Sequence, residues 1–200
     1  QNKSSFISRT TSFCFPSLSQ DSMLGDNADY CKKIRGLNIK EVMSNKYDVI
    51  FLAGRWDSMY QVYGDKGLNS LIESIELSSQ KAKQVFVFEQ PIFYKKNVTN
   101  QFLRSKAFSL FTNVFEKDDL YVSEINRKVI EAIEKGGFEN VHVISRDIIY
   151  GSASHNEITP KGLPYTFDRG HLSLIGSITA SNNFMETDLF LKIQKIIDEK

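Results

Sequence analysis

The chain is poor in features that would place it in several classes of protein. Its continuous apolar runs, such as 49–53 and 85–88, are short, and none reaches the length needed to span a bilayer. Lys and Arg number 25 against 24 for Asp and Glu, which gives a net charge of +1. Without an excess or a long run of basic residues, nothing in the composition points to nucleic acid as a partner.

Cysteine is also scarce. The chain has two, Cys14 and Cys31, 17 positions apart, and its three histidines are scattered (His142, His155 and His171). Two cysteines form no tetrahedral zinc site without two further ligands, so we expect no metal and no other cofactor. The residues alone leave open whether the two cysteines form a disulfide or remain free, buried thiols.

What the chain does have is the composition of an ordinary globular protein, with 41% apolar and 24% charged residues over 200 positions. This length and composition predict a single domain, 1–200, with a buried core. The chain begins with Gln1 rather than Met and does not start with a signal peptide, so we expect it to be a piece of a longer protein.

Strand and helix patterns alternate along the chain. Continuous apolar or β-branched stretches predict strands, and apolar spacings of three and four predict helices. The predicted strands are 6–11, 47–54, 84–89 and 141–145; the predicted helices are 28–44, 68–81, 101–115, 122–135, 172–180 and 188–198. This order predicts an α/β fold, a three-layer αβα sandwich around a mostly parallel sheet.

An acid and an imidazole, Asp168 and His171, lie three residues apart where a long predicted loop meets the helix at 172–180. A carboxylate beside an imidazole fixes its tautomer and stabilises the imidazolium, which supplies two members of a hydrolase triad. Asp-x-x-His is common by chance, however. The alternative is that Asp168 caps the helix beginning near His171, or lies at the surface without a role.

Four sequence elements occur in an order that is typical of one family. They are Thr-Ser-Phe-Cys-Phe-Pro at 11–16, Ile-Phe-Leu-Ala-Gly-Arg-Trp at 50–56 followed by Tyr60, Val-Phe-Glu-Gln-Pro at 87–91, and Asp168-x-x-His171-Leu172-Ser173-x-x-Gly176. From about Phe6 to about Ala180 the chain therefore resembles the SGNH (GDSL-like) hydrolases, which have a flavodoxin-like fold. Within them it is most similar to the C-terminal SGNH domain of acyltransferase family 3 membrane proteins, the O-acetyltransferases of bacterial surface polysaccharides.

The resemblance implies that Asp168 orients His171 and that His171 is the general base and acid. The family's nucleophile is a serine in a Gly-Asp-Ser block after the first strand of the fold. Neither Gly-Asp pair of this chain, at 25–26 or 64–65, is followed by serine. We expect the first strand and the nucleophile upstream of Gln1; the alternative is that this member has lost the serine.

A second departure concerns the oxyanion hole. Standard SGNH enzymes have Gly-x-Asn-Asp where this chain has Gly54-Arg55-Trp56-Asp57, and the fused-acyltransferase group shares the Arg-Trp variant. Arg55 either replaces the asparagine as a charged donor or pairs with an acid, and Trp56 is either a core residue or a wall for sugar stacking. Gly54 and a backbone N–H near Ser12 complete the expected site.

The resemblance also implies a location and a reaction. Such domains face the periplasm at the bacterial inner membrane, which favours a disulfide between Cys14 and Cys31. The implied function is O-acyl transfer, with an acyl-serine intermediate, from a donor supplied by a fused membrane domain to lipopolysaccharide or another surface glycan. The alternatives are a free-standing carbohydrate esterase of the same fold and a non-catalytic domain that binds glycan or supports a membrane enzyme.

Overall fold

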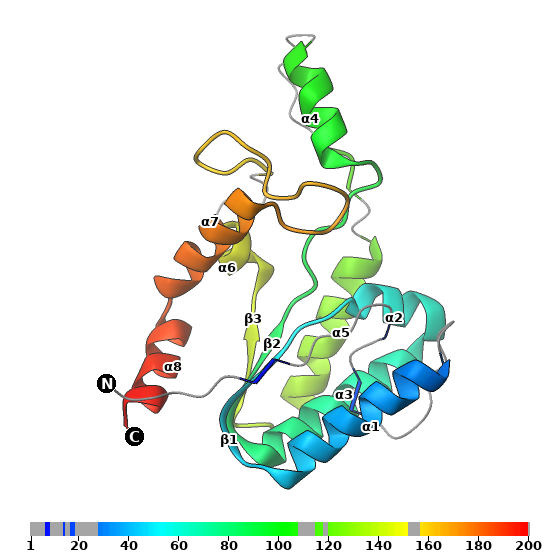
Figure 1. Ribbon diagram of the computed structural model, residues 1–200, viewed down its shortest axis with the longest axis vertical. Coiled ribbons are helices and arrows are strands. Elements are labelled where there is room, and N and C mark those ends of the chain that lie inside the picture. The colour runs from blue at the N-terminus through cyan, green and yellow to red at the C-terminus, as the bar shows by residue number, and fades with distance from the viewer. Residues whose placement is uncertain are drawn as a thin grey trace. The chain divides into compact units, whose positions relative to one another are not determined.

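The computed structural model describes residues 7–8, 14, 17–18, 28–107, 115–117, 120–151 and 157–199. Most of the predicted strand 6–11 lies outside these residues, as do Ser12 and His155. Within them, helices and strands alternate along the chain as the sequence predicts (Figure 1).

The chain forms two compact units, each built from several segments. The first unit comprises Gln1–Gln90, Ser123–Ile144 and Ile196–Lys200, and the second comprises Pro91–Val122 and Ser145–Lys195. The single domain expected from the sequence stays a prediction.

A parallel sheet lies at the centre of the first unit. It consists of β1 (Tyr47–Leu52), β2 (Ala82–Phe88) and β3 (Val141–Ile144), in the order β1-β2-β3 among the described residues. Both pairs of strands are parallel, with Ile50 beside Val85 and Val85 beside Val141. The continuous apolar runs therefore form parallel strands, and the predicted α/β class with a parallel sheet is confirmed.

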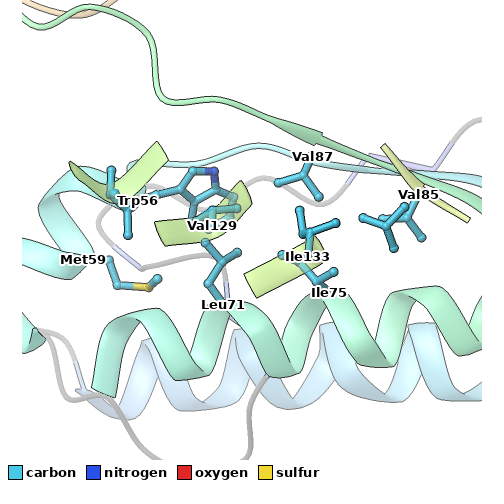
Figure 2. Close-up of a cluster of buried hydrophobic side chains, with 10 residues drawn as sticks. Trp56, Met59, Leu71, Ile75, Val85, Val87, Val129 and Ile133 are labelled. Carbon is cyan, nitrogen blue, oxygen red and sulfur yellow. The ribbon is translucent and has the colours of Figure 1, made fainter. Parts of the chain in front are cut away.

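Helices between these strands in the chain cover one face of the sheet. They are α2 (Trp56–Tyr63), α3 (Asp65–Lys81) and α5 (Leu120–Gly136), whereas α1 (Ala28–Ser44) precedes β1 and contacts α3. Side chains of α2, α3 and α5 meet Val85 and Val87 of β2 in one buried cluster, which Figure 2 shows between β2 and α3. Because strand side chains alternate between faces, these two valines point to the same side. Burying such a side chain contributes about 1.5–3 kcal/mol.

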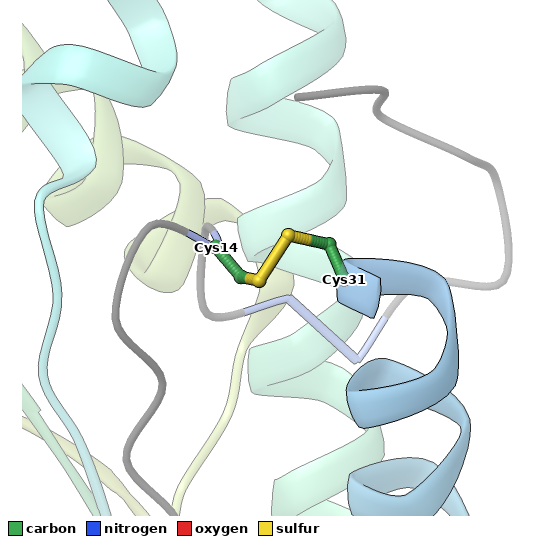
Figure 3. The surroundings of a disulfide bond; sticks show 2 residues. All are labelled: Cys14 and Cys31. Atoms are coloured by element: carbon green, nitrogen blue, oxygen red, sulfur yellow. A yellow bond between two sulfur atoms is a disulfide. The ribbon is translucent and has the colours of Figure 1, made fainter. Parts of the chain in front are cut away.

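A disulfide joins the segment before α1 to α1 itself. The bond links Cys14 to Cys31, as the resemblance implied, and Cys31 is 3% exposed (Figure 3). Two further contacts hold the same segment on α3: Ser17 hydrogen-bonds Ser70 through their hydroxyl groups, and the backbone N–H of Leu18 donates to the Ser74 hydroxyl at 2.7 Å. Cys14 is thus fixed covalently to α1, and Ser17 and Leu18 are held by hydrogen bonds to α3.

The second unit contains α4 (Val98–Ala107), α6 (Arg146–Tyr150), α7 (Leu174–Met185) and most of α8 (Asp188–Asp198). It has a core of its own, in which Tyr94, Tyr150 and Tyr165 are each at most 4% exposed. Tyr150 and Tyr165 meet edge to face, with ring centroids 5.2 Å apart. Because Tyr165 directly precedes the segment with the candidate acid and base, this core supports the site.

The helices differ from the sequence prediction in several places. The structure forms the short helices α2 and α6 in segments that were not predicted to be helical, and α4 begins at Val98 rather than at 101. The predicted extension of α4 to 115 falls largely on residues outside the described ones. Helix α7 begins at Leu174 because the Ser173 side chain caps it by accepting from the N–H of Gly176. Among the described residues, the helices are all too short or too polar to cross a membrane.

Candidate active site

The segment 165–173 folds into a closed turn. Thr166 and Leu172 form an antiparallel bridge, the N–H of Phe167 donates to the carbonyl of His171 at 3.1 Å, and the N–H of Ser173 donates to the carbonyl of Tyr165 at 2.7 Å. We call this segment the catalytic turn, after the role that the sequence analysis predicts for its Asp168 and His171. Its ends are paired by backbone hydrogen bonds, so the residues at its tip are held in one arrangement.

Asp168 and His171 are in direct contact within the catalytic turn. Oδ2 of Asp168 lies 2.7 Å from Nδ1 of His171, and Oδ1 accepts the backbone N–H groups of Gly170 and His171, each at 2.9 Å. The contact predicted from the three-residue spacing is therefore confirmed. These residues form a side-chain-to-backbone turn and not a turn of helix.

The alternative in which Asp168 caps the helix after it is wrong. The cap of α7 is Ser173, and the Asp168 carboxylate bonds instead to backbone N–H groups inside the catalytic turn. One oxygen shapes the backbone, and the other oxygen holds the imidazole.

The surroundings of Asp168 favour its ionised form. Burial alone would raise the pKa of this carboxyl, but the backbone N–H groups of Gly170 and His171 and the His171 ring outweigh burial and hold the pKa well below its usual range. An ionised carboxylate only accepts hydrogen bonds, so Nδ1 of His171 is the donor in this pair. In the neutral imidazole, Nε2 then carries the lone pair that a general base needs.

The imidazole of His171 is open to solvent in the structure. The His171 side chain is 72% exposed, whereas that of Asp168 is 29% exposed. The acid is therefore the sheltered member of the pair, and the imidazole is the member that can meet a reactant. This division suits an Asp that orients and a His that transfers protons.

Backbone groups from 94–99 support the catalytic turn. The N–H of Val98 donates to the carbonyl of Asp168 at 2.7 Å, and the N–H of Tyr94 donates to the carbonyl of Arg169 at 2.8 Å. The Nε of Arg169 returns a hydrogen bond to the carbonyl of Tyr94 at 2.9 Å. The start of α4 is thus bonded to Asp168, the residue that holds the His171 ring.

The sequence analysis did not identify this support. Its partners are about 70 residues apart in the chain, and backbone hydrogen bonds of this kind leave no residue pattern. The only sequence signal that could have indicated a close approach of other groups here is the presence of two glycines, Gly170 and Gly176. A Cβ at Gly170 would lie 2.8 Å from the Phe93 ring, and a Cβ at Gly176 would lie 2.0 Å from the carbonyl oxygen of Tyr165. Both positions need glycine because other groups approach them closely.

The remaining candidates belong to the first unit. Arg55 makes two hydrogen bonds of 2.8 Å to the carboxylate of Asp57 and one of 2.7 Å to the Ser58 hydroxyl, so its pairing with an acid is present in the structure. Gly54 lies between β1 and α2. The oxyanion role expected for Gly54, Arg55 and Ser12 stays a prediction.

Trp56 is a core residue. It is 2% exposed, its indole N–H donates to the carbonyl of Phe88 at 3.2 Å, and it lies in the cluster of Figure 2. The alternative in which Trp56 forms a wall for sugar stacking is therefore wrong, because the buried ring offers no face to a ligand. His142 lies on β3 and hydrogen-bonds Gln84, so it too serves the sheet.

No group of three or more potential metal ligands lies close together in the part of the chain that the structure describes. The chemistry available in the second unit is that of an acid–base pair on a supported turn. Such a pair activates a hydroxyl group for nucleophilic attack.

Comparisons with known proteins bear on the family to which the chain belongs. A family model described as "SGNH domain (fused to AT3 domains)" matches residues 1–186. Among solved structures, the chain is similar to the periplasmic domain of the lipopolysaccharide acetyltransferase of Salmonella ser. Paratyphi A, with a TM-score of 0.61 and 13% identity over 88% of this chain and 68% of that one. At this identity the likeness concerns the fold alone. The search of curated proteins found no match.

Proposed function

The chain belongs to the SGNH domains that are fused to AT3 domains, and we propose that it is the catalytic domain of an O-acyltransferase that acetylates a bacterial surface glycan. The observation that carries the proposal is the contact between Asp168 and His171, whose carboxylate and imidazole lie 2.7 Å apart. A carboxylate-oriented imidazole is the part of a serine triad that moves protons. A domain that only binds glycan has no chemical need for it.

In the proposed reaction, a serine attacks the acyl donor. Its Oγ forms a bond to the carbonyl carbon while Nε2 of His171 takes the hydroxyl proton, and that proton then leaves with the departing group of the donor. A sugar hydroxyl next attacks the acyl-serine ester, and His171 takes the proton of this hydroxyl. The same proton returns to the serine as the ester bond breaks, which restores the enzyme.

Asp168 stays ionised through both steps. Its carboxylate holds the Nδ1–H tautomer of His171 and stabilises the positive charge that the ring acquires in each transition state. The lowered pKa of Asp168 supports this role, because a carboxylate of low basicity does not take the Nδ1 proton from the imidazolium. The proton therefore remains on the ring, ready for the leaving group.

The serine of this proposal is not part of a Gly-Asp-Ser block within the 200 residues. We propose that the full gene product supplies it, together with the strand that carries it. The fusion described for the family supports an acyl donor delivered by an AT3 membrane domain. The structural neighbour, a periplasmic domain of a lipopolysaccharide acetyltransferase, supports a location on the periplasmic side of the inner membrane and a lipopolysaccharide or related glycan as acceptor.

One observation favours a second activity of the same site. With its side chain 72% exposed, His171 is also accessible to water in the structure. Water in place of the sugar hydroxyl would give an esterase by the same two steps. We therefore expect slow ester hydrolysis when no glycan is present.

An acetyl-transfer assay tests the proposal. Membranes containing the full-length gene product, its His171→Ala variant or its Asp168→Asn variant are incubated with lipopolysaccharide whose O-acetyl groups have been removed by base. New O-acetyl groups are then detected by NMR. We expect acetylation with the wild type and little or none with either variant. Equal acetylation by the wild type and the His171→Ala variant would exclude the proposed chemistry.

A further inference from the structure

Phe167 has an unusual environment for an aromatic residue of the second unit. Tyr94, Tyr150 and Tyr165 of this unit are at most 4% exposed, whereas Phe167 is 50% exposed. Its ring is stacked on the imidazole of His171, with centroids 6.0 Å apart and planes inclined by 23°. An apolar ring is thus open to solvent beside the general base.

The backbone of the catalytic turn sets this arrangement. The N–H of Phe167 bonds the carbonyl of His171, so the two residues face each other across the turn and their side chains project to the same side. The neighbouring Thr166 is 1% exposed, which places the opposite side of this part of the turn in the core. Exposure of Phe167 follows from the same alternation that exposes His171.

Thr99 holds the main chain of Phe167 from the other direction. Its backbone N–H and its hydroxyl both donate to the carbonyl of Phe167, the former at 3.3 Å. The Phe167 backbone is therefore bonded through both its N–H and its carbonyl group, although its side chain is exposed. A rigid backbone that presents an apolar ring to solvent is a feature of binding sites rather than of cores.

We propose that Phe167 is a binding platform for the acceptor sugar, an inference that rests on the proposed function. The C–H groups on one face of a pyranose ring are apolar and carry partial positive charge, which matches the negative face of an aromatic ring. Because the Phe167 and His171 ring centroids lie 6.0 Å apart, a sugar packed on the exposed surface of Phe167 has its hydroxyl groups in the neighbourhood of the imidazole. Hydrogen bonds to the polar groups of the sugar determine which of its hydroxyl groups is acylated, and Phe167 supplies the apolar contact.

An acetyl group fits this surface less well than a sugar does. It has a single methyl group to bury, and the serine ester fixes its position during the second step. A pyranose ring covers an aromatic ring far more completely. The proposal therefore assigns Phe167 to the step in which the sugar attacks, and not to the formation of the acyl-serine.

Separate measurements of the two steps test this assignment on the full-length protein. Formation of the acyl-enzyme is followed by release of p-nitrophenol from p-nitrophenyl acetate without glycan. Transfer is followed with O-polysaccharide, released by mild acid from lipopolysaccharide of the encoding strain and freed of acetyl groups. We expect Phe167→Ala to raise KM for the polysaccharide by about tenfold and to change p-nitrophenol release far less. Phe167→Tyr and Phe167→Trp should retain a low KM, because both keep a flat ring.

Three further variants make the outcome decisive. Leu191→Ala removes another exposed apolar side chain of the same unit, 57% exposed on α8, and should change neither step. Phe167→Leu keeps apolar bulk without a flat ring; it should raise KM and replaces the alanine variant if that variant is poorly folded by circular dichroism. His171→Ala should abolish both steps, and if it does not, the proposed function itself fails.

Two results would overturn the platform. The first is an equal loss of p-nitrophenol release and transfer in the Phe167 variants with KM for polysaccharide unchanged, which would make Phe167 a positioning residue for His171. The second is wild-type behaviour of Phe167→Ala and Phe167→Leu in both steps. Either result leaves the role of His171 intact if the His171→Ala variant is inactive.

Discussion

Asp168 holds His171 at two points, the ring and the backbone. Oδ2 of Asp168 is 2.7 Å from the ring Nδ1, and Oδ1 is 2.9 Å from the backbone nitrogen of the same residue. A single carboxylate therefore fixes both the tautomer of the imidazole and the conformation of the turn that carries it. This double role determines what substitution of Asp168 should do.

The first prediction concerns activity. Asp168→Asn replaces an acceptor by an amide whose NH₂ group can donate to Nδ1, so the lone pair is no longer confined to Nε2. We expect kcat for acyl transfer to fall by about 10³- to 10⁴-fold, as for the equivalent change in a serine triad. Asp147→Asn is a suitable control, because Asp147 lies exposed on α6 of the same unit. Similar rates for both variants would show that Asp168 does not orient the base.

The second prediction concerns stability as a function of pH. The pKa of Asp168 is lower in the folded protein than the value of about 3.9 expected for an unfolded chain. Such a group stabilises the fold above the unfolded pKa, and this contribution is lost as the pH falls through the folded pKa. The difference in free energy of unfolding between the wild type and Asp168→Asn should therefore be largest above about pH 4 and shrink below it. Urea unfolding at several pH values measures it, and a constant difference would contradict the lowered pKa.

The third prediction concerns the disulfide. Cys14 and Cys31 are 17 positions apart, and a loop of this size is expected to stabilise the fold by about 3 kcal/mol. Cys14→Ser with Cys31→Ser should lower the free energy of unfolding by about this amount, and addition of a reductant should destabilise only the wild type. Two thiols titrating in the unreduced, denatured protein would show that the bond does not form.

The fourth prediction concerns a glycine of the site. A Cβ at position 176 would lie 2.0 Å from the carbonyl oxygen of Tyr165, so α7 and the catalytic turn must separate in Gly176→Ala. We expect a loss of about 1–3 kcal/mol in stability and a marked fall in activity.

Gly36→Ala is the matched control for this substitution. Gly36 lies within α1, and a Cβ there would meet nothing within 4 Å, so alanine should stabilise the protein by up to about 1 kcal/mol. Thermal unfolding of the two variants measures both effects. Equal behaviour of Gly176→Ala and Gly36→Ala would contradict the close approach of α7 to the turn.

The parallel sheet was predictable because its signal is strong and local. Residues 49–52 of β1 and 85–88 of β2 are apolar without interruption, which is typical of parallel strands. Helix α8 was predicted with its observed bounds, Asp188–Asp198, because its apolar positions follow the helical period closely. The short helices α2 and α6 have 8 and 5 residues, too few to show a period.

The site was predictable in part for similar reasons. The three-residue spacing together with the family resemblance indicated Asp168 and His171, but neither contained the turn geometry or the support from the start of α4. Those contacts join residues far apart in the sequence through backbone atoms, which every residue has. For Trp56, the sequence left open a core residue or a wall for sugar stacking. Only its exposure of 2% in the folded chain decides for the core.

The most direct test of the central claim is reaction of the full-length gene product with a fluorophosphonate, followed by mass spectrometry of its peptides. The claim is that Asp168 and His171 activate a serine. We predict one adduct on one serine of the wild type and almost none in the His171→Ala variant at the same reaction time. A wild type without an adduct, or equal labelling of wild type and variant, would contradict the claim.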